Sequence, residues 1–413
     1  MTSPDAVAPA DWSARADEAA RSVTRMFGQR LFFLPGTHIA AIERPSSRLK
    51  NLMRPWHYWW QAHYVDCLVD AGRRELARGA RFDGGSRPSA GRLASQLVTG
   101  IRLRNFLTVV NSYYDDMAWL ALSTLRLEKL AEDSRKPGSR RNARIRQSLT
   151  LQFDSASTDD LGGGTFWSKK RDFKNTPATA PVALYYARTG NAVKAQALVD
   201  WLHAKLFDPA QGMYQDGLRI GAGGEVVLEA AIYTYNQGPV LGALLELGGR
   251  GNLDRAADLV GAVSRNLTRP AALESGRTAA VLRCDGSGDG GLFTGILARY
   301  LALAAADGRL PDRTRATAAA LVAETAQALW EGRRAVDPQE PLARHGAHVV
   351  FPVFPETPAA RSYPAGAVVE LSTQLQAWMV LEAAAVPQVG APGHPAWGTD
   401  LTIERPHPPG GGN

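Results

Sequence analysis

The fold is organised around a helix start with the sequence Tyr113-Tyr114-Asp115-Asp116-Met117-Ala118-Trp119. Apolar side chains then recur at helical spacing, at Met117, Leu120, Ala121 and Leu125, so this stretch predicts the beginning of a buried helix. Two adjacent carboxyl groups among aromatic and sulfur side chains would be partly desolvated, which raises at least one pKa and separates the two in proton affinity. Such a separation suits acid/base chemistry on a glycosidic bond.

The same stretch also has a purely structural interpretation. Ser112 precedes Asp115 by three residues, which is the spacing of a capping box, although that box prefers Glu or Gln at its last position. Carboxylates in a first helical turn are in addition stabilised by the helix dipole. The stretch alone does not decide between a charged helix start and an active site.

Composition indicates a globular chain long enough for a substantial core. The sequence has 413 residues, 45% hydrophobic and 21% charged, which allows one large domain or two ordinary ones. No apolar run approaches the ~20 residues that span a bilayer. Residues 1–20 lack the basic start and apolar centre of a secretory signal, so we expect a cytoplasmic protein, with export by another route left open. Cys67 and Cys284 are far apart, which predicts reduced thiols and no metal site.

The net charge of +7 is concentrated in one basic stretch. Between Ser134 and Gln147 lie Arg135, Lys136, Arg140, Arg141, Arg144 and Arg146, with Pro137-Gly138 marking a turn. No aromatic residue is interleaved to stack on bases, which argues against nucleic acid as a partner. We interpret the stretch as a solvated loop and helix face, with an anion-binding patch as the alternative.

Helical periodicity, capping residues and Pro or Gly breaks predict twelve helices. Their expected ranges are 11–29, a helix starting after Pro55, 89–104, a helix starting at the Asp pair, one through the basic stretch to about Phe153, 175–187, 192–207, 239–247, 253–267, 292–306, 311–330 and 366–385. Short connections alternate with longer ones, a pattern that closes into six helical hairpins. We therefore predict an all-α (α/α)6 barrel with a single catalytic domain over residues 1–386 and a disordered tail over residues 387–413.

Three further features bear on the site. The segment from Trp56 to Tyr64 is dense in aromatic residues, which fits either core packing or a platform for sugar rings. Gly162-Gly163-Gly164 has no preceding strand and no following Gly-Lys-Ser/Thr, so we expect a turn that lets the backbone approach a ligand or a neighbouring segment. Residues 212–229 predict a hairpin around Gly221-Ala222-Gly223-Gly224 that leads to polar side chains at the mouth of the eighth helix.

Taken together, these segments resemble glycoside hydrolase family 76, over roughly residues 56–385. The resemblance rests on Tyr113–Trp119, Gly163-Gly164-Thr165-Phe166-Trp167 with Lys174-Asn175, Asp216-Gly217, Thr234-Tyr235-Asn236-Gln237-Gly238 and Gly242–Leu247. It implies an (α/α)6 fold and endo-acting, retaining hydrolysis of α-1,6-linked mannan through a covalent glycosyl-enzyme intermediate. Carried onto this sequence, Asp115 would be the nucleophile and Asp116 the general acid/base.

We expect the substrate to be bound by Tyr114, Trp167, Asn175, Tyr235, Asn236 and Gln237, with aromatic rings for stacking and amides for sugar hydroxyls. For Trp167 and Tyr235 the alternative is core packing, and for Asn236 and Gln237 it is helix capping. The expected partner is an α-mannan or mannooligosaccharide substrate, and we expect a monomeric protein with no cofactor, no metal, no nucleic acid partner and no membrane span. The sequence departs from the family at Phe293-Thr294-Gly295, where Lys usually occupies the middle position.

Several other functions remain to be weighed. A terpene cyclase would need a third carboxylate three residues after Asp116, where Trp119 stands. A metal hydrolase would need a His-Glu-x-x-His pattern, which the eight His residues do not form; His345 and His348 lie in a Pro-rich loop. A non-catalytic glycan-binding barrel and a transglycosylase that uses the same residues stay open as alternatives.

Overall fold

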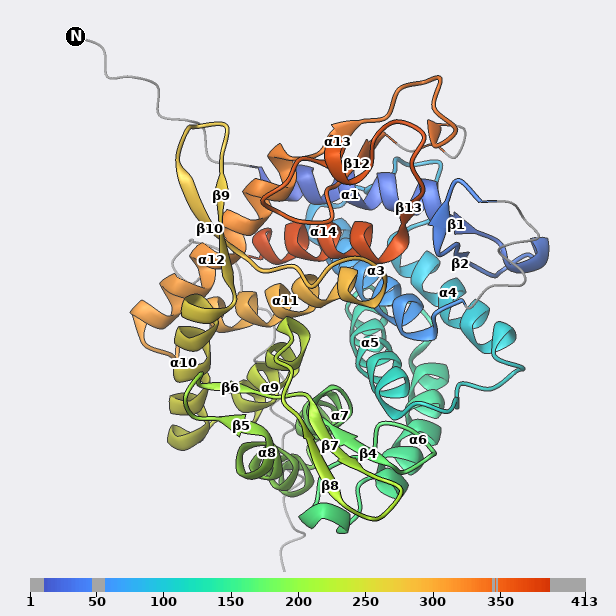
Figure 1. Cartoon of the computed structure of the whole chain (residues 1–413). Helices are drawn as coiled ribbons and strands as arrows, with labels where there is room; N and C mark the ends of the chain where they lie inside the picture. The colour runs from blue at the N-terminus through green and yellow to red at the C-terminus, as the bar shows by residue number, and fades with distance from the viewer. Residues whose placement is uncertain (1–10, 47–55, 344–345, 347, 387–413) are drawn as a thin grey trace, which may run out of the picture.

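The computed structural model describes residues 11–46, 56–343, 346 and 348–386. Within these ranges the long helices alternate between an inner and an outer ring (Figure 1). The inner helices are α3 (Tyr58–Arg78), α5 (Tyr114–Asp133), α7 (Thr176–Arg188), α9 (Thr234–Leu247), α11 (Phe293–Ala306) and α14 (Leu371–Ala384). The outer helices are α1 (Trp12–Phe27), α4 (Ala90–Arg104), α6 (Ser139–Ala156), α8 (Ala192–Leu206), α10 (Gly249–Asn266) and α12 (Asp312–Glu331).

Helix packing closes the inner ring. Each inner helix contacts the next one along the chain, and α14 returns to contact α3. Burial follows this division: every residue of α14 from Leu371 to Ala383 is buried, whereas α10 buries a single apolar face. The predicted (α/α)6 barrel is confirmed.

Glycines allow the inner helices to approach closely. A Cβ atom at Gly242 of α9 would lie 2.7 Å from the Tyr300 ring of α11, and one at Gly295 of α11 would lie 2.6 Å from Cε of Met379 on α14. These positions therefore have room for no side chain, and they set the spacing of three consecutive inner helices.

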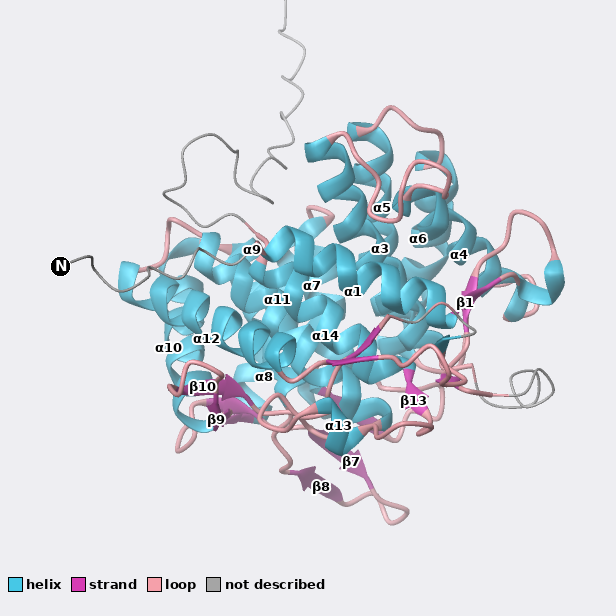
Figure 2. Cartoon of the chain, turned by 90° about the horizontal axis from the view of Figure 1, so that it is seen from above, coloured by secondary structure: helices cyan, strands magenta, loops and turns pink. Residues whose placement is uncertain are grey.

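All six inner helices begin at the same end of the barrel, which we call the mouth. The connections that reach the mouth are long and contain the strands, which lie mainly along one side of the helical body in Figure 2. The largest sheet has the order β4 (Phe173–Asn175), β7 (Gly217–Ile220), β8 (Val226–Glu229), with all pairs antiparallel and Gly217 paired with both Asn175 and Glu229. The predicted hairpin over residues 212–229 is thus present as β7 and β8.

The other strands form antiparallel pairs between these loops. They are β1 (Gly28–Gln29) with β2 (Ile39–Ala40), β3 (Glu43–Arg44) with β13 (Val369–Glu370), β5 (Phe207–Asp208) with β6 (Met213–Tyr214), β9 (Thr268–Ala272) with β10 (Thr278–Leu282), and β11 (Arg334–Ala335) with β12 (Val349–Val350). Three short 3-10 turns, η1 (Leu31–Phe33), η2 (Asp160–Gly162) and η3 (Gly288–Leu292), and the four-residue α13 (Ala359–Ser362) complete the described elements.

Two predicted helix starts were wrong by five residues. The eighth expected helix was placed at Pro239, but α9 begins at Thr234 and contains Pro239 in its second turn. The missing Pro N–H leaves the Tyr235 carbonyl without a helical donor, a loss that the helix tolerates near its start. The twelfth expected helix was placed at Gly366, but Val369 and Glu370 pair with β3 first, so α14 begins at Leu371. The expected tail, residues 387–413, and His345 lie outside the described residues.

A buried ion network crosses the barrel below the mouth. Asp66 and Asp70 of α3 both accept hydrogen bonds from Arg126 of α5 and Arg299 of α11. The two guanidinium groups outweigh the desolvation of Asp66 and lower its pKa to about 2. The network ties three inner helices together through charge-assisted hydrogen bonds.

Candidate active site

The Asp pair lies at the mouth, in the first turn of α5. The chain enters this helix in an extended conformation at Tyr113, which forms an isolated β-bridge with Ser168. The Tyr114 N–H donates to the Trp167 carbonyl (2.8 Å), which fixes the helix start to the loop after α6. No side chain caps this helix, so Ser112 does not form the capping box that its spacing allowed.

Asp115 faces the loop that follows the three glycines. The Trp167 indole N–H donates to Asp115 Oδ2 (3.0 Å), while Asp115 Oδ1 is buried without a hydrogen-bond partner. Trp167 is itself fixed by the Tyr113 ring, whose centroid lies 4.9 Å away, and by the edge of Phe173. Burial raises the pKa of Asp115 to about 7, against the opposing effect of hydrogen bonds from its own backbone, from Asp116 and from Trp167.

Asp116 faces the other side, toward the loop between α4 and α5. The Asn111 side-chain amide donates to Asp116 Oδ2 (2.6 Å). Burial raises the pKa of Asp116 well above its ordinary value, and the charge of Asp115 raises it further. Asp115 therefore loses its proton near neutral pH, and Asp116 loses its proton only at higher pH.

A third carboxylate, Asp289, approaches the pair from the η3 turn before α11. Its Oδ1 atom accepts from the indole N–H groups of Trp60 (2.9 Å) and Trp59 (3.2 Å) and lies 3.7 Å from His57 Nδ1. These partners hold the pKa of Asp289 below its ordinary value despite partial burial. Its negative charge raises the pKa values of Asp115 and Asp116, so the three carboxyls form one electrostatic group.

An aromatic wall borders this group. The Tyr235 ring is stacked on the Phe293 ring with a centroid distance of 3.7 Å and an interplanar angle of 14°. Tyr233 packs edge-on against Phe293 at 5.6 Å. Burial raises the pKa of Tyr235 well above its ordinary value, and the charges of Asp216, Asp115 and Asp289 add to this effect. Tyr235 therefore lies close enough to Asp115 and Asp289 for their charges to affect its pKa.

Asp216 and Asn236 form a second polar contact beside Tyr235. The Asn236 amide donates to Asp216 Oδ1 at 3.3 Å, and Asn236 Oδ1 is buried without a partner. Burial raises the pKa of Asp216 to about 6, with Asn236 opposing the shift. Asn236 is itself fully buried, so this polar contact lies behind the surface of the mouth.

Three residues predicted to bind substrate are engaged in the scaffold. Tyr114 is buried in the core, Asn175 caps α7 by accepting from the Ala178 N–H (3.1 Å), and Gln237 is bonded to the Tyr214 backbone on both sides. Each of these residues therefore stabilises a segment that positions Asp115, Trp167 or Tyr235.

Two of the three glycines before Trp167, Gly163 and Gly164, serve close packing. A Cβ atom at Gly164 would lie 2.6 Å from the Trp201 ring of α8, and Gly163 approaches the same ring. The buried ammonium of Lys174 then donates to the carbonyls of Thr158, Asp160 and Gly163. We expected this turn to let the backbone approach either a ligand or a neighbouring segment. The contacts among the described residues show approach to a neighbouring segment, α8.

Sequence reasoning did not single out Asp289, Asn111 or Phe293 as site residues. Asn111 lies only five residues before Asp116, in the loop that leads into α5, whereas Asp289 is distant in sequence and reaches the pair because the ring closes. Their position was the one available signal, because Asn111 and Asp289 each lie just before an inner helix, near the end of the barrel where Asp115 lies in the first turn of α5. Within the described residues, no group of three or more His, Cys, Asp and Glu side chains is placed to hold a metal ion. In the same part of the chain, no helix is long and apolar enough to cross a membrane.

A known protein family matches the part of the chain that contains this site. The model of glycosyl hydrolase family 76 matches residues 12–341, which include the Asp pair, the aromatic wall and Asp289. The chain belongs to glycosyl hydrolase family 76. It is therefore a glycoside hydrolase, and the resemblance inferred from the sequence motifs is confirmed.

Solved structures of family 76 share the fold. The α-1,6-mannanase of a Salegentibacter species is 27% identical with a TM-score of 0.71, and the alignment covers 91% of this chain and 99% of that one. An inactive variant of the same enzyme, with two consecutive Asp residues replaced by Asn, was solved with α-1,6-mannotriose; it is 26% identical with a TM-score of 0.70 and the same coverage. A family 76 mannosidase of Bacteroides thetaiotaomicron, 16% identical over 91% of this chain and 97% of that one, has a TM-score of 0.68. No curated protein sequence matches this chain.

Proposed function

We propose that this protein hydrolyses α-1,6-mannosidic linkages of a mannan-type glycan with retention of configuration. Asp115 acts as the nucleophile and Asp116 as the general acid/base. The observation that carries the proposal is the difference between the two buried carboxyls. Asp115 accepts a hydrogen bond from Trp167 and ionises near pH 7, whereas Asp116 holds its proton to higher pH.

The chemistry follows from this order of ionisation. In the first step Asp115 attacks the anomeric carbon while Asp116 donates its proton to the departing glycosidic oxygen. The glycosyl ester on Asp115 is then attacked by water, and Asp116, now ionised, accepts the proton of that water. The positive charge that develops on the sugar ring is stabilised by the nearby Asp115 and Asp289 carboxylates.

The substrate assignment is supported by the relatives. The Salegentibacter enzyme is an α-1,6-mannanase, and its variant lacking both Asp carboxylates was solved with α-1,6-mannotriose. In this chain Trp167 and Tyr235 supply aromatic surfaces for sugar rings, and the buried Asn236 holds Asp216 beside them. We assign Tyr114, Asn175 and Gln237 to supporting positions behind them.

The test is hydrolysis of α-1,6-mannotetraose by the purified protein, with α-1,2- and α-1,3-linked mannobioses as linkage controls. Cleavage of the α-1,6 substrate alone supports the proposal, and cleavage of the other linkages alone contradicts it. Products longer than the substrate would instead identify transglycosylation, in which a sugar hydroxyl replaces water in the second step.

The two Asp roles are separated by substrates that differ in leaving group. Asp116→Asn should lose activity on α-1,6-mannotetraose but keep most of its glycosylation rate on a dinitrophenyl α-1,6-mannobioside, because that leaving group needs no proton. Asp115→Asn should lose activity on both substrates, because no carboxylate attacks the anomeric carbon. The reverse pattern would exchange the two assignments.

A further inference from the structure

The Asn111 side chain bonds Asp116 through an amide whose orientation is fixed. Its Oδ1 atom accepts from the backbone N–H of Tyr113 (2.9 Å), so its Nδ2 group is the one that donates to Asp116 Oδ2 (2.6 Å). A flipped amide would set its own NH2 group against the Tyr113 N–H, so that two donors would face each other. Among the described residues, Asn111 is the one side chain that donates a hydrogen bond to Asp116.

This bond decides which oxygen of Asp116 carries the acid proton. Oδ2 accepts from Asn111, and the carbonyl oxygen of a carboxylic acid is a better acceptor than its hydroxyl oxygen. Oδ1 has no hydrogen-bond partner among the described residues, and unlike Asp115 Oδ1 it is not fully buried. The protonated carboxyl therefore holds its hydrogen on Oδ1, the oxygen that is free to donate to an acceptor from outside the chain.

The loop that carries Asn111 is tied to the scaffold on both sides. The Tyr58 hydroxyl of α3 donates to the Val109 carbonyl (2.7 Å), and the Asn105 amide at the end of α4 donates to the Val110 carbonyl (3.0 Å). Tyr58 and Val109 are both buried. Asn111 is thus held through α3 and α4 as well as through its own bond to the start of α5, so its amide is in place before a substrate arrives.

Titratable groups face Asp116 from three elements. Asp115 precedes it on α5, Asp289 approaches from η3, and Tyr58 lies on α3, where burial and then the Asp116 charge raise the Tyr58 pKa. Burial raises the pKa of Asp116, both carboxylates raise it further, and the bond from Asn111 opposes them. Asn111 therefore stabilises the ionised form of Asp116 against two negative neighbours.

We propose that Asn111 is a positioning residue for the acid/base step: its amide keeps the proton of Asp116 on Oδ1 and stabilises the carboxylate that forms when this proton leaves. In the first step the Oδ1–H bond breaks and the proton joins the glycosidic oxygen, which takes the electron pair of its bond to the anomeric carbon while Asp115 bonds that carbon. Asp116 stays ionised, with Asn111 donating to it, until it accepts a proton from water. The proton transfer rests on the proposed function, whereas the effect of Asn111 on the proton affinity of Asp116 does not.

The other role open to Asn111 is that of a turn residue. A bond from an Asn or Asp oxygen to the N–H two residues later is a common turn, and either side chain can form it. Asn111→Asp therefore separates the two roles, because it keeps the size and the turn acceptor but replaces the donor with a carboxyl oxygen. Asn111→Ala loses both the acceptor and the donor.

Carbon-13 NMR titration of protein labelled at the Asp carboxyl carbons tests the effect on Asp116 without substrate. Asp116→Asn identifies its resonance. Asn111→Ala should raise the Asp116 pKa by about 1–2 pH units, the contribution expected of a hydrogen bond to a charged group. Asn111→Asp should raise it at least as far, because it adds a negative charge beside Asp116.

Two substrates separate proton delivery from the position of α5. On α-1,6-mannotetraose, kcat/KM of Asn111→Ala should fall about tenfold or more, and the basic limb of its pH dependence should move to higher pH, because Asp116 keeps its proton longer without its donor. Glycosylation by dinitrophenyl α-1,6-mannobioside should stay close to the wild-type rate, because that leaving group needs no proton. A misplaced first turn of α5 would instead slow both substrates, since Asp115 lies in the same turn.

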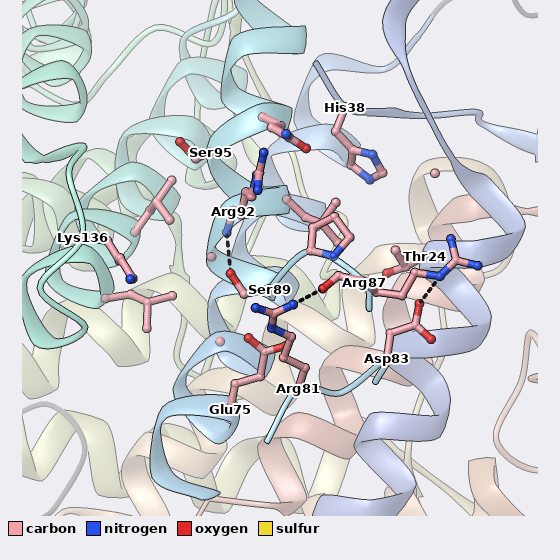
Figure 3. A pocket seen from close by; sticks show the side chains of 18 of the residues that line it. Thr24, His38, Glu75, Arg81, Asp83, Arg87, Ser89, Arg92, Ser95 and Lys136 are labelled. Carbon is pink, nitrogen blue, oxygen red and sulfur yellow. Dashed lines mark hydrogen bonds and ion pairs between the residues drawn. The ribbon is translucent and has the colours of Figure 1, made fainter. Parts of the chain in front are cut away.

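Ser89→Ala is the matched control. Ser89 also accepts from a backbone N–H at a helix start, that of Arg92 (3.4 Å). It lines a groove of about 1520 Å³ at the end of the barrel opposite the mouth, and none of the residues that bond the Asp pair lines this groove (Figure 3). Ser89→Ala should leave the Asp116 titration, the pH profile and both rates at their wild-type values.

Three results separate the outcomes. Equal slowing on both substrates with an unmoved basic limb, or an Asp116 pKa that is unchanged in both Asn111 variants, would overturn the proposal. Wild-type behaviour of Asn111→Asp would also overturn it, because a turn acceptor alone would then suffice. If no protein, wild type included, cleaves α-1,6-mannosides while both variants raise the Asp116 pKa, the proposed function fails and the effect of Asn111 on Asp116 stands.

Discussion

The indole N–H of Trp167 lies 3.0 Å from Oδ2 of Asp115, although the two residues are 52 positions apart. This bond connects the loop after α6 to the first turn of α5, and it stabilises the ionised form of the carboxyl. The loop that contains Trp167 thereby influences the pH at which Asp115, the proposed nucleophile, ionises.

Trp167→Phe should move the acidic limb of the pH dependence of kcat/KM to higher pH. In the wild type this limb should lie near the Asp115 pKa of about 7. The Phe ring keeps the contact with Tyr113 but loses the donor, so the ionised carboxylate is less stable and its pKa rises. A shift of one pH unit corresponds to roughly 1.4 kcal/mol of lost stabilisation. A pH profile with an unchanged acidic limb would show that this bond does not tune the titrating group.

Asp289→Asn should move the same limb in the opposite direction. The Asp289 charge raises the pKa values of both Asp115 and Asp116, so its removal favours their ionisation. We also expect a fall in kcat/KM of roughly 10- to 100-fold, or about 1.4–2.7 kcal/mol, since the variant loses a carboxylate near the positive charge that develops on the sugar ring. The control is Asp200→Asn on α8, which should leave the pH profile unchanged. An upward shift in the Asp289 variant would contradict the proposed electrostatic group.

Arg299→Met should destabilise the fold strongly. Arg299 bonds both Asp66 and Asp70 in the barrel interior, so the variant leaves two buried carboxylates with only Arg126 as a shared cation. Removing one partner of a buried ion pair costs about 3–5 kcal/mol. Urea unfolding measures the change. Arg250→Met, which removes an exposed i,i+4 pair with Asp254, should cost less than about 0.5 kcal/mol.

Gly242→Ala and Gly251→Ala should have opposite effects on the free energy of unfolding. Both glycines are helical, but a Cβ atom at Gly242 would lie 2.7 Å from the Tyr300 ring, whereas nothing lies within 4 Å of one at Gly251. Overpacking should cost about 1–3 kcal/mol at Gly242. At Gly251 the alanine should be neutral or stabilise by up to ~1 kcal/mol, because it restricts the unfolded chain. Equal effects would mean that α9 and α11 can separate without cost.

The sequence was sufficient to predict the helical hairpins, because periodicity and caps are local properties. Asp115 and Asp116 could also be singled out, since they lie in a short motif at a helix start, and Trp167 belongs to a Gly-Gly-Thr-Phe-Trp segment on which the family resemblance rests. Pro239 was misleading because its position in α9 depends on contacts of Thr234 with Asp285, which are not local. Asp289 could not be assigned for the same reason: its partners Trp59 and Trp60 lie about 230 residues earlier, on a helix that meets η3 only when the ring closes.

The amide side chains show a different limit. Asn175, Asn236 and Gln237 have similar chemistry and all lie near helix starts, so sequence patterns did not distinguish them. In the structure the side chains of Asn175 and Gln237 form hydrogen bonds with backbone groups, whereas Oδ1 of Asn236 has no hydrogen-bond partner. Only the positions of their partners distinguish the two amides that bind backbone groups from the buried Asn236, which holds Asp216.

The central claim is that Asp115 forms a covalent glycosyl intermediate, and the stereochemistry of the first product tests it most directly. Proton NMR during cleavage of α-1,6-mannotetraose by the wild-type protein records the anomeric configuration of the newly formed reducing end before mutarotation. Two displacements, first by Asp115 and then by water, predict that the α-anomer appears first and the β-anomer follows slowly. Initial formation of the β-anomer would mean a single displacement by water and would contradict the account.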